Sequence, residues 1–284
     1  MTINGETRLL GLLGWPVGHS FSPAMHNAAL AAAGLNYAYV PLAVRPSGLK
    51  TAVSALSSLN FRGVNVTVPH KQTIIPFLDE IDPAAAAIGA VNTVVIEDDG
   101  RLLGKNSDWS GFMADLAALD VDVNACTELG RSGRSCVIFG AGGSARAVAY
   151  GLVQAGAMVY VVARRQEQAE VLVEEMGLPH GSITAATVDV VGGLTAPLLV
   201  NCTPLGMHPH EDGSVWNGEF PPDSFAYDLV YNPTETLFMR QARAAGCEVA
   251  NGLGMLLRQG AVAFEWWTGV MPDVSVMRSV FENQ

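Results

Sequence analysis

The sequence predicts an α/β protein of two domains. A chain of 284 residues is long enough for about two domains of ordinary size. Hydrophobic residues make up 49% and charged residues 15%, which is typical of a well-buried globular α/β protein rather than a disordered one. A strand, a glycine turn, a helix and a second strand follow one another within residues 135–165. This order is that of a βαβ unit, which indicates a parallel sheet.

Strands and helices are expected to alternate in the N-terminal part of the chain. Its last two strands are expected to form a hairpin, because an Asp-Asp-Gly turn separates them. The predicted strands are residues 8–14, 37–43, 64–68, 90–97 and 102–105. The predicted helices are residues 23–33, 47–59 and 73–78, and a further helix over 110–119 leads into a polar linker, 120–134.

The remaining residues predict a second sheet followed by helices. Its strands are expected at residues 135–139, 157–163, 184–188, 198–201, 225–229 and 248–250. Its helices are expected at residues 146–155 and 235–245, and two C-terminal helices at 254–267 and 274–281. We therefore place one domain at residues 1–110, completed by the C-terminal helices within 246–284, and a second domain at 120–245.

The glycine turn after the strand 135–139 favours dinucleotide binding. Gly140 allows a tight turn, Gly142 lets the backbone approach a pyrophosphate, and Ala145 lets the helix lie close to the sheet. The start of that helix offers N–H groups and a positive dipole end to phosphate. Glycine turns also occur in ordinary strand–helix loops, but here both flanking strands and the helix are present.

Two arginines follow the second strand of this unit. An NAD site usually has an aspartate or glutamate there, which holds the ribose 2′-hydroxyl. Arg164 and Arg165 instead offer guanidinium groups that suit a 2′-phosphate, so the sequence favours NADP(H). The alternative is a solvated basic pair at the start of a surface helix.

The net charge limits the classes of partner, and the cysteine usage indicates the cellular compartment. A net charge of −11 argues against nucleic acid and anionic membranes, but not against an anionic small molecule. The N-terminus shows no signal peptide, and no apolar run suggests a transmembrane helix. The cysteines are scattered, and Cys136 and Cys202 lie in apolar runs, so we expect buried free thiols and a cytoplasmic location.

Polar clusters interrupt the apolar pattern of the first domain where predicted strands end. They are Ser20-Phe-Ser22, Asn65-Val-Thr-Val-Pro-His-Lys71, Asn92-Thr93 and Asn106-Ser-Asp108. Polar side chains in apolar strands are costly unless something satisfies them. Because substrates of α/β sheets bind at the carboxyl ends of strands, these clusters predict the substrate site.

With Asn201-Cys-Thr-Pro-Leu-Gly-Met207 and Gly252-Leu-Gly-Met-Leu-Leu-Arg-Gln259-Gly, these motifs resemble the shikimate dehydrogenases in order and over nearly the whole chain. The resemblance implies a substrate-binding α/β domain and a Rossmann-type NADP-binding domain separated by a cleft. It also implies the reversible, NADPH-dependent reduction of 3-dehydroshikimate to shikimate in aromatic amino-acid (chorismate) biosynthesis.

The resemblance also implies roles for individual residues. Lys71 and Asp108 are expected to be the catalytic pair. The expected substrate-binding residues are Ser20, Ser22, Asn65, Thr67, Asn92, Tyr231 and Gln259. The expected cofactor-binding residues are Gly140, Ala141, Gly142, Gly143, Ser144, Ala145, Ala163, Arg164, Arg165, Thr203, Leu205, Gly206, Met207, Leu229, Gly252 and Met255.

Simpler interpretations exist for several of these residues. Lys71 could be a helix-start lysine that pairs with any nearby carboxylate. Ser20 and Ser22, at alternate positions, suit a substrate carboxylate but could also cap the helix that follows. Asn and Gln amides donate and accept at once, as a polyol demands, yet they are also common in loops.

The sequence departs from the family pattern at three positions. Ala163 and Arg165 stand where the family often has Asn and Thr, and Ser107 replaces the more usual Thr. The His208-Pro-His210 segment has a metal-like spacing, but no further ligands follow at an established distance, so we expect a solvated loop and no metal.

The sequence leaves two alternative functions open. One is a quinate/shikimate dehydrogenase that uses NAD, against which Arg164 and Arg165 argue. The other is a catalytically silent NADP(H)-binding sensor, against which the presence of both Lys71 and Asp108 argues. The expected partner is a small-molecule substrate, without nucleic acid or membrane, and the assembly considered is a homodimer.

Overall fold

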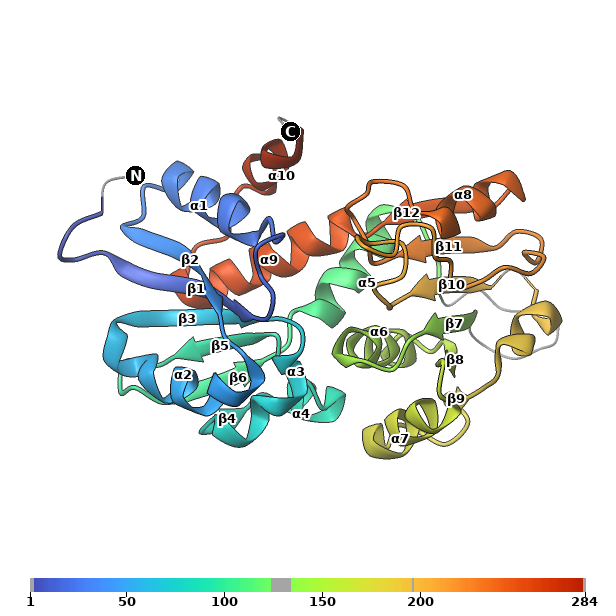
Figure 1. The fold of residues 1–284 in the computed structure, drawn as a ribbon, viewed down its shortest axis with the longest axis horizontal. Helices are drawn as coiled ribbons and strands as arrows, with labels where there is room; N and C mark the ends of the chain where they lie inside the picture. Colours follow the sequence, from blue (N-terminus) through green and yellow to red (C-terminus); the bar gives the residue numbers. More distant parts are fainter. Residues whose placement is uncertain (1–2, 124–133, 196, 283–284) are drawn as a thin grey trace. The chain divides into compact units, whose positions relative to one another are not determined.

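The computed structural model describes residues 3–123, 134–195 and 197–282 (Figure 1), and the chain divides into two compact units. Unit 1 comprises Met1–Gly111 and Leu257–Gln284, and unit 2 comprises Phe112–Leu256. Both boundaries fall within helices, α5 (Asp108–Ala118) and α9 (Leu253–Thr268). Most of the predicted linker, residues 124–133, lies outside the described residues.

Unit 1 contains a mixed sheet in the order β2-β1-β3-β5-β6-β4. Its strands are β1 (Arg8–Gly14), β2 (Tyr37–Ala43), β3 (Phe61–Val66), β4 (Glu80–Ile81), β5 (Thr93–Ile96) and β6 (Leu102–Lys105). β1 runs parallel to β2 and β3, whereas β5 is antiparallel to β3 and β6. The predicted hairpin is therefore confirmed.

One face of this sheet packs on short helices. Val64 and Val66 of β3 contact the apolar cluster that includes Val53 of α2 (Leu49–Ala55) and Ala85 of α4 (Pro83–Ile88). Because strand side chains alternate, Asn65 lies on the opposite face from these valines. The alternation of side chains along β3 thus places the Asn65 amide on the face away from the apolar cluster.

Aromatic side chains from α1 (Ser22–Ala32), β2 and α9 stack against one another in unit 1. The His26 ring lies parallel to the Tyr39 ring, with 4.4 Å between centroids, and also stacks on Phe264 at 6.3 Å. The Trp267 indole N–H donates to the carbonyl of Val94 at 3.0 Å. Gly63 makes room for this ring, since a Cβ there would lie 2.1 Å from the indole nitrogen.

Several predicted elements differ from the structure. The helix expected at 47–59 is broken into the 3-10 turn Pro46–Gly48, α2, and the 3-10 turn Ser57–Leu59, and the last of these ends where Asn60 adopts a left-handed conformation with φ of 59°. The helix expected at 73–78 is instead α3 (His70–Thr73) followed by a 3-10 turn, Ile75–Phe77.

Strand boundaries differ as well. β3 begins at Phe61, three residues earlier than expected, since Phe61 and Gly63 pair with Leu9 and Leu10 of β1. β5 is shorter than the strand predicted over 90–97. The strand expected at 184–188 is β9 (Ile183–Ala185), and a 3-10 helix, Val188–Gly193, follows it.

Unit 2 has a wholly parallel sheet in the order β12-β11-β10-β7-β8-β9. Its strands are β7 (Ser135–Phe139), β8 (Met158–Val162), β9, β10 (Leu198–Asn201), β11 (Phe225–Asp228) and β12 (Glu248–Asn251). The chain starts in the middle of this sheet, builds outward to β9 and then returns to build the other half. This is the doubly wound order of dinucleotide-binding domains, so the predicted Rossmann-type sheet is confirmed.

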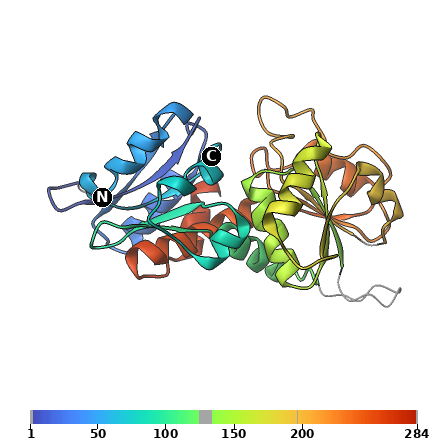
Figure 2. The same ribbon diagram turned by 90° about the horizontal axis from the view of Figure 1, so that it is seen from below.

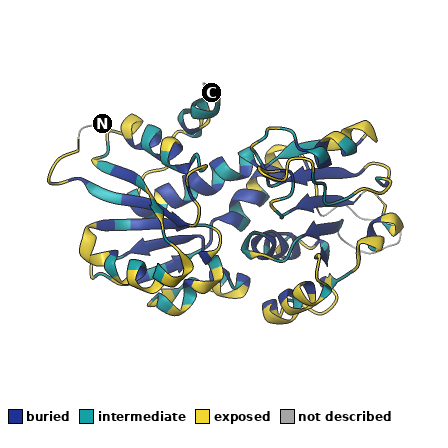
Figure 3. Cartoon of the chain, viewed as in Figure 1, coloured by how far each residue is buried: buried dark blue, intermediate teal, exposed yellow. Residues whose placement is uncertain are grey.

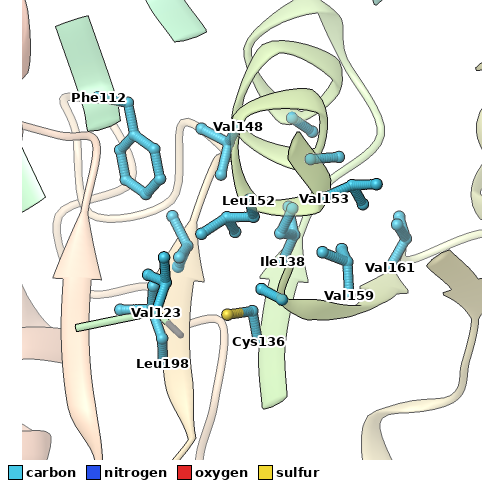
Figure 4. Packing of buried hydrophobic residues seen from close by; sticks show 14 of the residues in the cluster. Phe112, Val123, Cys136, Ile138, Val148, Leu152, Val153, Val159, Val161 and Leu198 are labelled. Carbon is cyan, nitrogen blue, oxygen red and sulfur yellow. The ribbon is translucent and has the colours of Figure 1, made fainter. Parts of the chain in front are cut away.

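Helices cover both faces of the unit 2 sheet (Figure 2). Cys136 and Ile138 of β7 pack towards α6 (Gly143–Gln154), through Val148 and Leu152 (Figure 4). The alternate residue Val137 packs with α8 (Leu237–Ala244) in a second cluster. α7 (Gln166–Met176) joins the first cluster, and the strands are buried while the outer helix faces are exposed (Figure 3). Because helices cover both faces of this sheet, the side chains on both faces are buried, and the strands are apolar at nearly every position.

The C-terminus folds as α9 and α10 (Val274–Glu282), in agreement with the two predicted C-terminal helices. Within the described residues, none of the helices is long and apolar enough to cross a membrane.

We expect His26 to make the protein sensitive to acid. Burial lowers the pKa of His26 to about 3, and neither ring nitrogen has a hydrogen-bond partner in the described part of the chain. Between pH 3 and an unfolded pKa of about 6.5, the unfolded state binds a proton that the folded state excludes, so stability falls as the pH falls. At pH 5 this loss is about 2 kcal/mol.

The variant His26→Phe keeps the ring stack and removes the titration. Urea unfolding at pH 7.5 and pH 5 measures the free energy of unfolding of both proteins. Relative to the wild type, the variant should be more stable at pH 5 than at pH 7.5 by about 2 kcal/mol. The exposed His180 offers a control, His180→Gln, which should not change the difference. Parallel pH dependence of the wild type and His26→Phe would contradict the assignment.

Candidate active site

A buried ion pair lies at the centre of the polar residues in unit 1. The Lys71 Nζ is 2.6 Å from the Asp108 Oδ2, with side-chain exposures of 13% and 8%. Lys71 belongs to α3, the first helix after β3, and Asp108 is the first residue of α5, the first helix after β6. The two predicted catalytic residues are therefore brought together, and both come from segments that follow strands.

The backbone around Lys71 is fixed on both sides. The His70 Nε2 lies 2.7 Å from the carbonyl oxygen of Val44, and the Lys71 carbonyl accepts a hydrogen bond of 2.7 Å from the Val91 N–H. α3 has only four residues, so these contacts rather than helix length hold the lysine in place.

Asn92 joins the ion pair to the surrounding polar groups. Its Nδ2 donates to the Asp108 Oδ1 at 2.7 Å and lies 3.0 Å from the Ser107 Oγ and 3.3 Å from the Gln259 Oε1. Its Oδ1 accepts from the Ser107 N–H at 2.8 Å and the Thr93 hydroxyl at 3.0 Å. The amide orientation is thus determined, and the Asp108 carboxylate is held from the side away from Lys71.

Asn65 is fixed by residues for which the sequence predicted no role. The Tyr39 hydroxyl donates to the Asn65 Oδ1 at 2.8 Å, and the Asn65 Nδ2 donates to the Thr93 Oγ1 at 3.2 Å. Tyr39 is a strand residue of a type common in any sheet, so only its hydrogen bond to Asn65 identifies it. Thr93 belonged to a recognised polar cluster without an assigned role.

Gln259 enters the same network from α9. Its Oε1 also lies 3.3 Å from the Ser107 Oγ. Gly111 lets the two helices approach closely, because a Cβ there would lie 2.7 Å from the backbone nitrogen of Gln259. Four of the predicted residues, Lys71, Asn92, Asp108 and Gln259, are therefore connected. Asn65 joins them through Thr93 and by donating to the Asn92 carbonyl at 3.3 Å.

The remaining predicted substrate residues are Ser20, Ser22, Thr67 and Tyr231. Ser20 Oγ accepts the Ser22 N–H at 3.2 Å, and α1 begins at Ser22 rather than Pro23. The N-cap residue is Phe21, so capping by the Ser22 side chain, the alternative considered from sequence, is wrong. Thr67 is half-buried and its N–H donates to Leu13 at 2.9 Å. Tyr231 belongs to unit 2.

The glycine turn of unit 2 has the geometry that a pyrophosphate needs. Gly140 has a φ of 115°, and a Cβ there would lie 3.1 Å from the Thr203 side chain. At Gly142 a Cβ would meet nothing within 4 Å, which leaves the backbone open to a ligand. α6 begins at Gly143 and includes Ser144 and Ala145, while Ala141 is half-buried in the turn. This chain's residues fit a bound dinucleotide.

Arg164 and Arg165 are exposed after the end of β8, and Ala163 before them is half-buried. Arg165 is the N-cap residue of α7 but makes no capping hydrogen bond through its side chain. Within residues 3–123, 134–195 and 197–282, neither guanidinium forms an ion pair. Both charges are therefore available to an anionic ligand.

The other predicted cofactor residues follow β10 and β11 or begin α9. Thr203, Leu205, Gly206 and the exposed Met207 form the loop after β10. Leu229 follows β11 and lies against Gly252, where a Cβ would be 2.1 Å from the Leu229 carbonyl oxygen. Met255 is buried in the main cluster of unit 2. Asn201 and Asp228, which hold this region, were not assigned a role from sequence.

The His208–His210 segment is a surface loop. His208 Nδ1 lies 2.8 Å from the Glu211 Oε1, and both side chains are exposed. In the described part of the chain, no group of three or more histidine, cysteine, aspartate or glutamate side chains is placed to hold a metal ion. Cys136, Cys202 and Cys247 form no disulfide within the described residues. Cys136 is buried as expected, whereas Cys202 is half-buried.

A Rossmann-type sheet with an open glycine turn, carried by the same chain as a buried lysine–aspartate pair, is typical of nicotinamide-dependent oxidoreductases. Residues 12–94 match the model of the shikimate dehydrogenase substrate binding domain, and residues 252–280 match that of the shikimate 5′-dehydrogenase C-terminal domain.

Known proteins agree over the full length. The chain is 46% identical to a shikimate dehydrogenase (NADP(+)) of Desulforamulus reducens, over 99% of this chain and 97% of that protein. The identity is 45% with the corresponding protein of Carboxydothermus hydrogenoformans, over 98% of each chain. This protein belongs to the shikimate dehydrogenase family.

Two solved structures are similar across the whole fold. The shikimate 5-dehydrogenase of Thermus thermophilus, in complex with NADP(H) and shikimate, has a TM-score of 0.85 and 38% identity, covering 97% of this chain and 99% of that one. The quinate dehydrogenase of Corynebacterium glutamicum, in complex with NAD, has a TM-score of 0.84 and 36% identity, covering 98% of this chain and 99% of that one.

The contact between Asn92 and Asp108 predicts the effect of Asn92→Asp. This nearly isosteric change replaces an amide donor 2.7 Å from the Asp108 Oδ1 by a second carboxylate. Like charges at this distance in a buried site should lower the free energy of unfolding at pH 8 by about 3 kcal/mol. Part of the loss should return at pH 5, where the two carboxylates can share a proton.

Urea unfolding at both pH values measures the effect. The exposed Asn217 provides a matched control, Asn217→Asp. If Asn92→Asp costs no more stability than this control, the network does not depend on the Asn92 amide donor.

Proposed function

We propose that this protein is an NADP-dependent shikimate dehydrogenase, which reversibly reduces 3-dehydroshikimate to shikimate. The observation that carries the proposal is the buried Lys71–Asp108 pair, with 2.6 Å between Nζ and Oδ2, surrounded by amides and hydroxyls that suit a polyol. Family membership and the NADP(H) named for the relatives support the same reaction.

The proton in this reaction is assigned to Lys71. Reduction of a ketone leaves an alkoxide oxygen that needs a proton, and the Lys71 ammonium donates it. When bound, NADPH supplies the hydride. In the reverse direction the neutral amine accepts the hydroxyl proton. Asp108 holds Nζ in position and Asn92 holds Asp108, so the proton donor has one orientation.

The substrate would be held by residues at or after the ends of strands in unit 1 and by one residue of α9. Asn65, Asn92 and Gln259 offer amides to the ring hydroxyls, together with Thr67. The role of Tyr231 in substrate binding stays a prediction. Ser20 accepts the Ser22 N–H through its oxygen, which leaves the Ser20 O–H to donate to the substrate carboxylate. Ser22 provides a second hydroxyl beside it.

The cofactor would be held by unit 2. The turn Gly140–Ser144 and Ala145 suit the pyrophosphate, and Ala163, Arg164 and Arg165 suit the 2′-phosphate end. Thr203, Leu205, Gly206, Met207, Leu229, Gly252 and Met255 are proposed to line the nicotinamide end. A cytoplasmic location and a homodimer stay predictions.

A nicotinamide absorbance assay tests the proposal directly. Shikimate and quinate are each offered with NADP and with NAD. We expect turnover with shikimate and NADP to exceed every other pair. Faster turnover with quinate and NAD would instead assign the activity of the related quinate dehydrogenase, and no turnover with any pair would leave a binding protein without catalysis.

Lys71→Ala should abolish turnover because it removes the proton donor. We expect kcat to fall by a factor of about 1,000 or more, while the Kd of NADPH, measured by its fluorescence, changes less than about twofold. The exposed Lys50 on α2 gives the matched control, Lys50→Ala, with unchanged kinetics. A kcat for Lys71→Ala near that of the control would rule out the proposed role.

The double variant Arg164→Ala/Arg165→Ala should lose the preference for NADP. Two guanidinium groups that bind a phosphate contribute charge-assisted hydrogen bonds, so the KM for NADP should rise by a factor of about 10 to 100. The KM for NAD, which lacks the phosphate, should change less than about threefold. Arg240→Ala on the surface of α8 is the control, and an equal rise for both cofactors would contradict the assignment.

A further inference from the structure

Asp228 is a buried carboxylate at the end of β11 that the proposed reaction does not use. Its side chain is 0% exposed, and no cation forms an ion pair with it within the described residues. Burial raises the pKa of Asp228 to about 6, against the opposing effect of hydrogen bonds from Thr236, Val230 and Asn201. A carboxylate in such a place is costly, so its three donors have to be held closely around it.

The first of these donors connects Asp228 to the loop after β10. The Asn201 Nδ2 donates to the Asp228 Oδ1 at 2.9 Å and to the Leu205 carbonyl at 3.0 Å. The Asn201 Oδ1 accepts from the Thr203 N–H at 2.9 Å and from the Thr203 hydroxyl at 2.8 Å. Since Asp228 accepts from the Nδ2 group, it fixes which way the Asn201 amide faces, and the amide in turn fixes the loop backbone.

The second donor connects Asp228 to Gly206. The Thr236 hydroxyl donates to the Asp228 Oδ2 at 2.6 Å, and Thr236 also caps α8 by accepting the Met239 N–H at 3.3 Å. Gly206 packs directly on Thr236, because a Cβ at Gly206 would lie 2.9 Å from the Thr236 methyl. Gly206 also has a φ of 94°. The loop therefore rests on a threonine that Asp228 orients.

The third donor holds the segment after β11. The Val230 N–H donates to the Asp228 Oδ1 at 2.9 Å, which fixes the turn that contains Leu229. The Leu229 backbone lies against Gly252, where a Cβ would be 2.9 Å from the Leu229 Cα. One carboxylate thus reaches the loop Thr203–Met207, Leu229 and Gly252, the three segments proposed to line the nicotinamide end of the cofactor.

We infer that Asp228 is the positioning residue of the cofactor site, which sets the affinity for NADP(H) by holding these three segments without touching the cofactor. The inference rests on the proposed function, because that function assigns the segments to the cofactor. We expect Asp228 to act on the NADP(H) side of the reaction, since its donors Asn201, Val230 and Thr236 belong to unit 2.

Two substitutions separate positioning from general stability. Asp228→Ala leaves the Asn201 amide, the Val230 N–H and the Thr236 hydroxyl without their acceptor. Asp228→Asn keeps the shape: its oxygen can accept from Asn201 and Val230, while its Nδ2 can donate to the Thr236 oxygen. The exposed Glu174 on α7 provides the control, Glu174→Gln.

Three readouts are measured on the full chain: the Kd of NADPH by fluorescence, the KM values for NADP and shikimate, and amide hydrogen exchange over residues 203–207. For Asp228→Ala we expect the Kd of NADPH and the KM of NADP to rise about tenfold, with the KM of shikimate changed less than about twofold. Exchange over the loop should accelerate. Asp228→Asn and Glu174→Gln should stay within about threefold of the wild type on every readout.

Each outcome bears on a different statement. If the wild type binds NADPH and Asp228→Ala binds it equally well, the inference is overturned while the proposed function stands. If the wild type binds no NADPH, the proposed function fails, and hydrogen exchange still decides whether Asp228 holds the loop. An equal rise in both KM values would overturn the inference in favour of a general loss of structure.

Thr236→Val replaces Asp228→Ala if that variant does not fold. It removes one donor to the carboxylate but keeps the methyl group that packs on Gly206. We expect a Kd for NADPH about threefold above the wild type, and an unchanged Kd with unchanged exchange over residues 203–207 would overturn the inference.

Discussion

Taking a carboxylate out of water is unfavourable unless donors surround it, and each unit of this chain buries one where a strand ends. In unit 1 Asp108 is held by a cation, Lys71, and by the Asn92 amide. In unit 2 the donors that hold Asp228, among the residues that the structure describes, are all neutral. Much of the surrounding order follows from satisfying these two groups, because every donor that faces a carboxylate is then fixed in direction and holds its own neighbours.

The different partners give the two carboxylates different chemistry. A cation beside Asp108 keeps a mobile proton at the site, on a side chain that can reach a substrate. Asp228 has no such cation within the described residues, and burial accordingly raises its pKa to about 6. The first arrangement suits proton transfer, whereas the second suits the holding of backbone segments. The hydrogen bonds alone do not distinguish the two carboxylates, whereas their burial and the charge of their donors do.

The sequence predicted the folds of both units well because the apolar runs are strong and glycine turns separate them. β1, β2, β6 and β10 match the predicted ranges. Prediction was poorer where long-range packing decides the backbone. β3 includes Gly63, a residue unfavourable in strands, because the Trp267 ring needs the space.

The candidate site was predictable where a polar residue stands out from an apolar run, as Asn65 and Asn92 do. Tyr39 was not found, since tyrosine is ordinary in a strand and its role depends on the distance to Asn65. The roles of Asp228 and Asn201 were not predicted from the sequence, for a related reason. Polar residues at strand ends resemble turn residues, and only the tertiary structure shows that they are buried and face each other.

The contact between Gly63 and Trp267 has a consequence for how the chain can vary. The indole donates to the Val94 carbonyl at 3.0 Å through the space that a side chain at position 63 would occupy. A larger residue at 63 is therefore tolerated only together with a smaller one at 267, and a smaller residue at 267 leaves a carbonyl without its donor. Positions separated by some two hundred residues are thus bound to change as a pair, and an evolving lineage has to cross a less stable intermediate to change either.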